Sequence, residues 1–457
     1  MQNVDARQSA QVSSAQAKDE WPKESYSWYV VLVLCICGMV AFIDRQIINL
    51  LVEDIKADLQ ISDTEVSLLQ GFAFAVFYAL AAVPLGRLAD TSSRRRLITV
   101  GIVVWTAAAA ACGLAKSFWQ LFIARVFVGV GEATLTPSGF SMLADLFRPG
   151  RVSLPVAVFT ASSFVGSGVA LLVGGYVISA LSRVDNISLP IIGVLQTWEA
   201  AFIICALPGI LVALWFHLTV REPVRRASVS SNAIADQSAK PSLHEVWVFV
   251  RGHSQVFTAV FAGISVLAAV QFCLGAWVPA HFIRNHGWTP SEVGYAYGLI
   301  FLICGTGGAI SGGWIADRLQ RKGVKDGHLL TAMWAALLAA PFVVVFPAVS
   351  QAELAIALLA PVVFFGTMPF GAGPALIPVI CPPRMRGLLV AIYLLIANLI
   401  GQAGGPLVVA LFTDWVFGSP ELVSRSLMVA PVALLLIGAV LVGRGRSELR
   451  RFYEQAA

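Results

Sequence analysis

The stretch GRLADTSSRRR, residues 86–96, directly follows the second long apolar run of the chain and is the most informative segment of the sequence. A weaker copy, GWIADRLQRK, occupies residues 313–322. Gly86 and Gly313 are 227 residues apart, which is about half of the 457-residue chain. A repeat at half the chain length predicts two halves of similar construction.

The sequence around this repeat is strongly apolar. Hydrophobic residues make up 58% of the chain and charged residues 12%, whereas a soluble domain carries about 25% charged residues. Long continuous runs favour membrane helices, each of which needs roughly 20 apolar residues. The sequence therefore predicts an all-α membrane protein with twelve transmembrane helices in two pseudo-symmetric six-helix bundles. The expected spans lie near residues 28–51, 66–90, 96–115, 118–142, 152–180, 198–219, 255–280, 291–317, 328–348, 353–379, 385–415 and 424–443.

Domain boundaries and orientation follow from the polar segments. Lys and Arg concentrate in the loops of one side, which is therefore predicted to be cytoplasmic together with both termini. We expect the inner (plasma) membrane of a bacterium, and a short surface helix within the linker at residues 243–249. The predicted units are a disordered tail at 1–27, the N-terminal bundle at 28–219, a linker at 220–254, the C-terminal bundle at 255–443 and a cytoplasmic tail at 444–457.

Several classes of function lack their sequence signals. The chain has no phosphate-binding glycine loop, nucleophile elbow or metal-ligand cluster, so we expect neither an enzyme nor a protein with a metal or cofactor. It has no basic patch with interleaved aromatic residues, so nucleic acid is not an expected partner. The expected partners are a small-molecule or lipid substrate, protons and membrane lipids, bound by a monomer.

Four charged residues inside the spans carry the functional prediction: Asp44, Arg45, Arg125 and Glu132. Uncompensated, they would together cost on the order of 10 kcal/mol in the bilayer, so they should face a cavity and pair with one another. Asp44 and Arg125 both lie roughly 10 Å below the outer ends of their helices. We therefore predict that Asp44 or Glu132 pairs with Arg125, with Arg45 nearby.

Roles for these residues follow from their chemistry. Arg45 and Arg125 would hold an anionic headgroup, since a guanidinium group matches phosphate or carboxylate. Asp44 and Glu132 would exchange protons; a purely structural ion-pair cluster is the alternative. The second half offers polar and aromatic residues instead, which would line an apolar cavity wall or simply pack against lipid or neighbouring helices: Gln271, Trp277, Phe370, Tyr393 and Asn398.

These motifs resemble the major facilitator superfamily. The repeated loop motif matches its loop signature, and RVFVGVGEA at 125–133 matches its fourth helix. Within the superfamily the chain resembles the spinster group, through Asp44-Arg45, ADLF at 144–147 and VGSG at 165–168.

The resemblance implies secondary transport by alternating access, proton-linked, of an anionic amphiphile such as a lysophospholipid or sphingolipid-like phosphate. A proton symporter of small organic anions, such as sugar acids, is the alternative in the same fold. A lipid-modifying enzyme, a scramblase and a transport-dead receptor are further hypotheses. The resemblance also assigns a conformational gate to Gly86, Asp90, Arg94, Gly313 and Asp317.

Overall fold

The structure is a computed structural model, and it describes residues 21–148, 150–184, 187–189, 193–226, 243–382 and 384–455. These residues are almost wholly helical, and twelve helices are long and apolar enough to cross a membrane. The predicted fold class is confirmed. Residues 1–20 of the predicted N-terminal tail, residues 227–242 of the linker and the last two residues lie outside the described residues.

The first six spans form one bundle. A two-stranded antiparallel hairpin, β1 (Ile187–Leu189) and β2 (Gly193–Leu195), precedes its last helix. The spans are α2 (Glu24–Leu50); α4 (Asp63–Ser67), η1 (Leu68–Phe72) and α5 (Ala73–Thr91); α6 (Arg94–Cys112); α7 (Phe118–Glu132) and α8 (Leu135–Leu146); α9 (Ser153–Leu181); and α10 (Thr197–Thr219), with the short α3 (Val52–Leu59) between the first two.

The last six spans form the second bundle. A surface helix, α11 (Leu243–Gly252), precedes them and confirms the predicted helix in the linker. The spans are α12 (Ser254–Thr258), η3 (Ala259–Gly263) and α13 (Ile264–His286); α14 (Pro290–Ile300), η4 (Phe301–Gly305) and α15 (Thr306–Arg321); α16 (Gly327–Val345) and η5 (Phe346–Ala348); α17 (Ala352–Ala372) and η6 (Pro374–Leu376); α19 (Arg386–Ile396), η7 (Ala397–Ala403), α20 (Gly404–Leu411) and η8 (Phe412–Phe417); and η9 (Pro420–Leu422) with α21 (Val423–Gln455), while α18 (Ile377–Ile380) follows η6.

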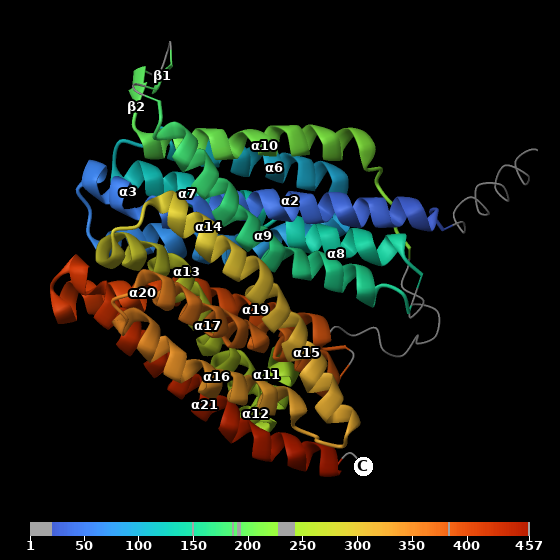
Figure 1. The fold of residues 1–457 in the computed structure, drawn as a ribbon. Coiled ribbons are helices and arrows are strands. Elements are labelled where there is room, and N and C mark those ends of the chain that lie inside the picture. The colour runs from blue at the N-terminus through green and yellow to red at the C-terminus, as the bar shows by residue number, and fades with distance from the viewer. Residues whose placement is uncertain are drawn as a thin grey trace, which may run out of the picture.

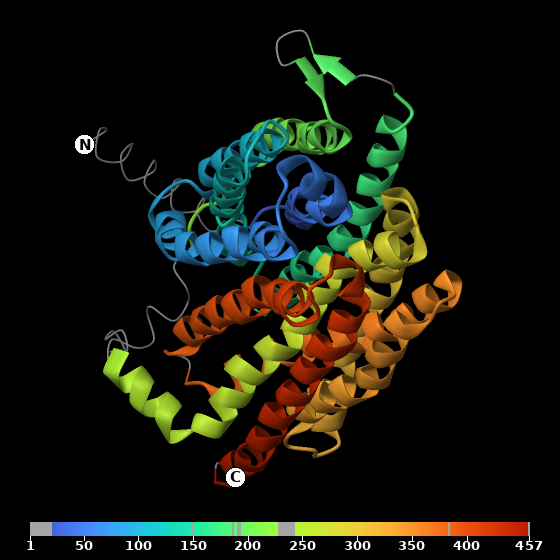
Figure 2. The same cartoon turned by 90° about the vertical axis from the view of Figure 1, so that its left-hand side faces the viewer.

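The two bundles lie against each other along their length but are not parallel. Figure 1 shows the N-terminal bundle above and the C-terminal bundle below, converging at the end that bears α3 and α20 and diverging toward the C terminus. Figure 2, viewed from the converging end, shows the two bundles as separate groups of helices. We call the converging end the outer end and the opposite one, which carries most of the basic loops, the basic end.

Close helix contacts join the bundles on two sides. Along one side α9 packs on α14 and η4, and a Cβ atom added at Gly168 would lie 2.7 Å from the backbone nitrogen of Leu302 in η4. Along the other side α5 and η1 pack on η7, where a Cβ atom at Gly71 would collide with the carbonyl oxygen of Gln402. Only glycine permits such backbone approach, so these residues fix how closely the bundles can converge.

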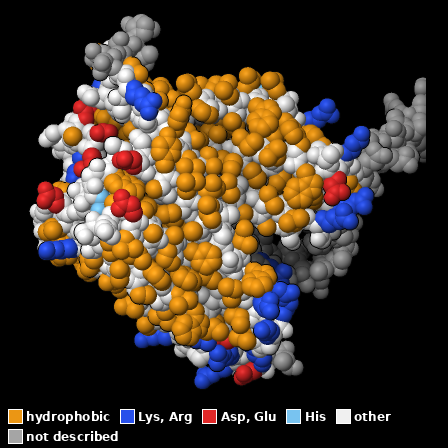
Figure 3. Space-filling model, in the orientation of Figure 1, with side chains coloured by type: hydrophobic (Ala, Val, Ile, Leu, Met, Phe, Trp, Pro, Cys, Tyr) orange, Lys and Arg blue, Asp and Glu red, His pale blue; other side chains and the backbone are white. Residues whose placement is uncertain are grey.

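The surface matches a membrane-embedded body. Figure 3 shows a broad apolar band across the middle of one face, with acidic side chains gathered at the outer end and Lys and Arg side chains at the basic end. Leu211, Ile303 and Trp415 are among the large apolar side chains exposed to the surroundings. This distribution agrees with twelve spans and with basic loops concentrated on one side.

The tenth span is interrupted, as its prolines predict. Pro361 and Pro369 lie inside α17, and the helix gives way after Ala372 to the short turns η6 and α18. Proline removes a backbone donor and disturbs the preceding turn, so this end of the span does not continue as a regular helix.

The last helix runs further than predicted. The sequence places a tail after residue 443, but α21 remains helical to Gln455. Asp326, which is 1% exposed, accepts a hydrogen bond of 2.6 Å from Arg446 Nε and lies 2.9 Å from Arg450 Nε. Burial acts to raise the pKa of Asp326, but the guanidinium groups of Arg450 and Arg446 outweigh it and lower the pKa below its ordinary value. This ion pair ties the helix extension to the bundle.

We expect Asp326→Asn to lower the melting temperature of the detergent-purified protein. Because the pKa of Asp326 is depressed in the folded state, its contribution is present above the ordinary carboxyl pKa of about 4 and is lost as the pH falls through the folded value. The difference between wild type and variant should therefore shrink below about pH 4. Asp317→Asn is the control, because the Asp317 side chain is 67% exposed and its one ion-pair contact among the described residues is with His328, at 3.8 Å. A difference that persists undiminished at low pH would contradict this role.

Candidate functional site

A cavity inside the N-terminal bundle contains two of the four predicted charges. It has a volume of about 110 Å³. Arg45 and Glu132 reach it from α2 and α7, and the rest of its wall comes from α2, α5, α8 and α9. The other lining residues are Gly38, Ala41, Phe42, Tyr78, Leu135, Thr136, Phe140, Phe159, Thr160, Ser162 and Ser163.

Arg45 and Glu132 form an ion pair in this cavity. Arg45 Nη2 donates to Glu132 Oε2, and the Arg45 side chain is 18% exposed while that of Glu132 is 2% exposed. Three aromatic rings lie around the Arg45 guanidinium, with centroids 4.6 Å away for Phe42, 4.2 Å for Phe74 and 6.0 Å for Tyr78. Cation–π attraction therefore holds the guanidinium group against an apolar wall.

The predicted ion pair of Arg125 is not the one that forms. Arg125 is fully buried, and its guanidinium donates to backbone carbonyl oxygens, that of Asp44 at 3.0 Å and that of Leu69 at 3.3 Å. Both carboxylate oxygens of Asp44 are buried and, in the described part of the chain, have no hydrogen-bond partner. The cavity wall includes neither residue.

Side-chain direction explains this difference. Helical side chains lean toward the N-terminus of their helix, so the long Arg125 side chain extends away from Glu132, which lies two turns further along. Asp44 and Arg45 are consecutive and therefore point about 100° apart, so that only Arg45 faces Glu132. Residue spacing correctly placed Arg125 at the level of Asp44, whose carbonyl oxygen it reaches, whereas the choice of ionic partner depended on these side-chain directions.

The predicted lining residues of the second half lie outside this cavity. Trp277 is fully buried, and its indole N–H donates to the carbonyl oxygen of Pro406 at 2.8 Å, so it packs within the C-terminal bundle. Gln271 and Tyr393 are also buried, and Asn398 donates to the Leu394 carbonyl oxygen at 2.7 Å. Phe370 alone contacts the other bundle, with its ring centroid 5.7 Å from that of Phe164.

Arg94 is the most firmly held of the predicted gate residues. It is fully buried and pairs with Asp145 and, at 2.9 Å, with Glu222. Burial acts to raise the pKa of Glu222, but hydrogen bonds from the Arg95 backbone, Arg94 and Ser93 outweigh it and lower the pKa below its usual value. Arg94 therefore joins α6, α8 and the segment after α10 within one bundle.

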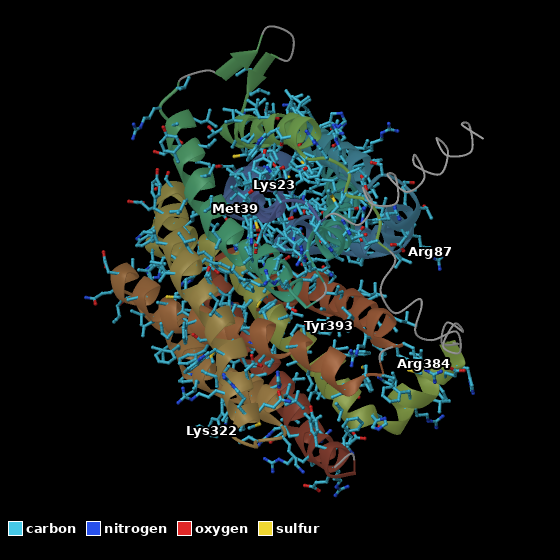
Figure 4. The ribbon with its side chains drawn as sticks, turned by 90° about the vertical axis from the view of Figure 1, so that its right-hand side faces the viewer. Lys23, Met39, Arg87, Lys322, Arg384 and Tyr393 are labelled. Carbon is cyan, nitrogen blue, oxygen red and sulfur yellow. The ribbon has the colours of Figure 1, made fainter. Side chains whose placement is uncertain are left out.

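The other predicted gate residues are loosely packed in this state. Asp90 is exposed, and the Asp317 side chain is 67% exposed. A Cβ atom at Gly86 or Gly313 would meet only ordinary contacts of 3.5 Å or more, so neither glycine is needed for close packing here. Figure 4 shows the basic end, where Arg87 of the N-terminal bundle and Arg384 of the C-terminal bundle lie near the same edge.

The sequence reasoning missed two groups of residues. Phe42, Phe74 and Tyr78 surround Arg45. The available signal was helical spacing: Phe42 precedes Arg45 by three residues and Phe74 precedes Tyr78 by four, so the members of each pair lie on the same helix face. Ser162 and Ser163 line the cavity from α9, a helix from which only the VGSG motif at 165–168 entered the sequence prediction.

The two carboxylates should differ in their effect on stability. Glu132→Gln removes the ionic partner of Arg45 and should lower unfolding stability by about 1–3 kcal/mol. Asp44→Asn should leave stability unchanged or raise it, because the Asp44 carboxylate has no partner to lose among the described residues. Thermal unfolding of the purified variants in detergent measures both, and a larger loss for Asp44→Asn than for Glu132→Gln would contradict this geometry.

Comparison with known proteins places the chain in a family. A sequence model of the Major Facilitator Superfamily matches residues 34–406. The chain is 28% identical to an MFS-type efflux pump of Mycolicibacterium smegmatis, over 93% of this chain and 94% of that protein. It is 27% identical to protein spinster homolog 1 of Mus musculus, over 85% of this chain and 73% of that protein.

A solved structure shares the fold. A bacterial homologue of the human lysosomal transporter Spinster, described as inward-facing and unoccupied, superposes with a TM-score of 0.81 at 24% identity, covering 94% of this chain and 99% of that one. A bacterial homologue of the same human transporter, described as inward-facing and occupied, gives a TM-score of 0.73 at 23% identity, covering 95% of this chain and 98% of that one. With its twelve spans and its repeated loop motif, the chain belongs to the Major Facilitator Superfamily and is a secondary transporter of the spinster type.

Proposed function

We propose that this transporter works by alternating access, couples to protons and moves an anionic amphiphile such as a lysophospholipid or a sphingolipid-like phosphate. The observation that carries the proposal is the Arg45–Glu132 pair, in which a partly exposed guanidinium group faces a cavity and a buried carboxylate neutralises it. An arriving anion and the Glu132 carboxylate would compete for the same cation.

This competition supplies the coupling. When a phosphate or carboxylate group binds Arg45, Glu132 loses its ionic partner while it remains buried. A buried carboxylate without a partner is more stable as the neutral acid, so Glu132 takes up a proton as the substrate binds. Asp44, whose buried oxygens have no partner in the described part of the chain, is assigned a proton already in this conformation. Arg125 is assigned a supporting role behind the cavity.

The cavity wall supports an amphiphilic ligand. Phe42, Phe140 and Phe159 line the cavity beside the ion pair, so a polar head would bind next to apolar surface. The volume of about 110 Å³ is well below the roughly 300–1,000 Å³ of pockets that enclose a drug-sized ligand, so this cavity would hold a headgroup and not an acyl chain. The chain of a bound lipid would therefore extend beyond this cavity, between the diverging bundles.

The same volume also favours the alternative substrate. A small organic anion, such as a sugar acid, could bind Arg45 through its carboxylate and need no further apolar surface. Both substrates use the same ion pair, and the need for a long apolar tail distinguishes them.

The conformation supports an assignment to the inward-open state. The bundles converge at the outer end and diverge at the basic end. We assign the basic end, which carries most of the Lys and Arg residues of the loops, to the cytoplasmic side of a bacterial inner membrane, with both termini on that side. Exposure of Asp90 and Asp317 fits this assignment, because the proposed gate contacts of these residues would form only when the basic end closes.

Flux into proteoliposomes tests the substrate and the coupling together. We expect a pH gradient to stimulate uptake of a labelled lysophospholipid several-fold, and Glu132→Gln to abolish that stimulation because the variant cannot exchange a proton there. Glu199→Gln is the matched control, since Glu199 is another buried glutamate paired with a basic residue, Lys116, but does not line the cavity.

Two results would overturn parts of this proposal. Transport of a sugar acid without transport of lysophospholipid would remove the lipid substrate and leave the small-anion alternative. A pH response that survives in Glu132→Gln would remove Glu132 from the proton path, whichever substrate moves.

A further inference from the structure

The outer end holds a charge cluster that crosses between the bundles. Arg284, in the last turn of α13, donates from both terminal nitrogens to Asp63 at the start of α4, at 2.7 and 2.8 Å, and from Nε to Glu53 of α3 at 2.8 Å. Lys56 of α3 pairs with the same Asp63 carboxylate. We propose that Arg284 and Lys56 compete for Asp63, and that this competition sets how readily the outer end opens during the proposed alternating-access cycle, on which this inference rests.

The contact between Arg284 and Asp63 is strong because of its shape and burial. A guanidinium group that meets a carboxylate through two parallel hydrogen bonds forms the most favourable ion-pair geometry in proteins. The Asp63 side chain is completely buried and that of Arg284 is 6% exposed, whereas Glu53 is 35% exposed. Asp63 is therefore the main anchor, and Glu53 can return to solvent when the bundles separate.

Lys56 lowers the cost of breaking that contact. Lys56 and Asp63 belong to the N-terminal bundle and are joined by the short turn between α3 and α4, which Gln60 closes with a left-handed backbone (φ 52°). When the bundles separate, Lys56 moves with Asp63 and keeps its carboxylate paired. Without Lys56, opening would leave the Asp63 carboxylate with no ionic partner, so the contact with Arg284 would be harder to break.

Arg284 also keeps partners of its own after separation. Its Nη1 donates to the Pro420 carbonyl oxygen at 3.0 Å, and its guanidinium lies 5.6 Å from the Trp277 ring centroid. Both partners belong to the C-terminal bundle and move with Arg284. Asp63 and Arg284 would thus each keep a partner whether the outer end is closed or open, which is the property that a reversible gate requires.

A second polar contact closes the same end. The Asp414 carboxylate of η8 accepts from the backbone nitrogen of Thr64 at 2.7 Å and from its hydroxyl group at 2.6 Å, again between the bundles. Deeper in, Gln70 donates to the Ala276 carbonyl oxygen at 3.3 Å. These contacts involve neither Arg284 nor Lys56, so substitution of either basic residue changes the balance at Asp63 and leaves the rest of the seal in place.

The competition predicts opposite effects for two charge-neutralising substitutions. Arg284→Gln should favour the outward-open state, because it removes the cation that crosses between the bundles. Lys56→Gln should favour the outward-closed state, because Asp63 then depends on Arg284 alone. Lys116→Gln is the matched control, since Lys116 also pairs with a fully buried carboxylate, that of Glu199, but within one bundle.

Thiol labelling from the outer side measures this balance. A reporter cysteine replaces Ser163 in the cavity, and a membrane-impermeant maleimide is applied to the outer face in vesicles of known sidedness, with protein lacking the reporter as the blank. We expect labelling to rise about tenfold in Arg284→Gln and to fall about tenfold in Lys56→Gln, with no change in Lys116→Gln. Arg284→Lys keeps the positive charge but cannot form the two parallel hydrogen bonds to Asp63. Its labelling rate should lie between those of wild type and Arg284→Gln.

The outcomes separate the gate from the proposed function, because labelling needs no substrate. Shifts of the same sign in Arg284→Gln and Lys56→Gln, or a wild-type labelling rate in Arg284→Gln, overturn the competition at Asp63. Opposite shifts uphold it even where lysophospholipid fails to move, and in that case only the substrate assignment falls.

Discussion

The ion pair between Arg45 and Glu132 is the interaction around which the transporter is organised. Charged groups inside membrane spans are costly, and these two lie within the spans formed by α2 and by α7 with α8. Each residue neutralises the charge of the other, so a change of partner at one leaves the other residue without its counter-charge. In the proposed cycle, an anion that binds Arg45 would therefore alter Glu132, and a proton on Glu132 would free Arg45. This mutual dependence is the physical basis of the proposed coupling.

The surroundings of the pair preserve this sensitivity. Phe42, Phe74 and Tyr78 hold the Arg45 guanidinium by cation–π contact without supplying a competing charge. Arg125 is occupied by two backbone carbonyl oxygens, so its guanidinium holds α2 and η1 in place and does not take Glu132 from Arg45. The cavity therefore presents a single guanidinium group with a single ionic partner.

The outer end restricts the side from which this site can be reached. Arg284, Asp63 and Glu53 form a charged contact between the bundles, and Gly71 and Gly168 allow the helices beneath it to approach closely. At the basic end, Arg94 and Asp326 each hold segments of one bundle together. The ion pairs are thus of two kinds. Some lie within one bundle and stabilise it, and others lie between the bundles and would break in the proposed transport cycle.

Sequence patterns predicted the architecture better than the contacts. The repeat at Gly86 and Gly313, with the apolar runs, was sufficient for twelve spans in two bundles, because periodicity and length are set by the membrane. Residue spacing also brought Arg45 and Glu132 to one site. The partner of Arg125 and the burial of Trp277 were not predictable, because both depend on side-chain direction and on helix packing between distant segments.

The outer cluster shows which signal was overlooked. Lys56, Lys116 and Arg284 lie at the outer end, where basic residues are few, and the prediction of the site made no use of them. In the structure all three pair with fully buried carboxylates. A basic residue on the side where such residues are rare is therefore worth matching with a nearby acidic residue.

Infrared difference spectroscopy of the carboxyl C=O band tests the central claim most directly, because it observes protonation of Glu132 itself. On addition of the transported anion, the wild-type protein should gain a protonated-carboxyl band that is absent in Glu132→Gln and retained in Asp44→Asn. A substrate-induced band that persists in Glu132→Gln would contradict the account, because the proton would then bind elsewhere.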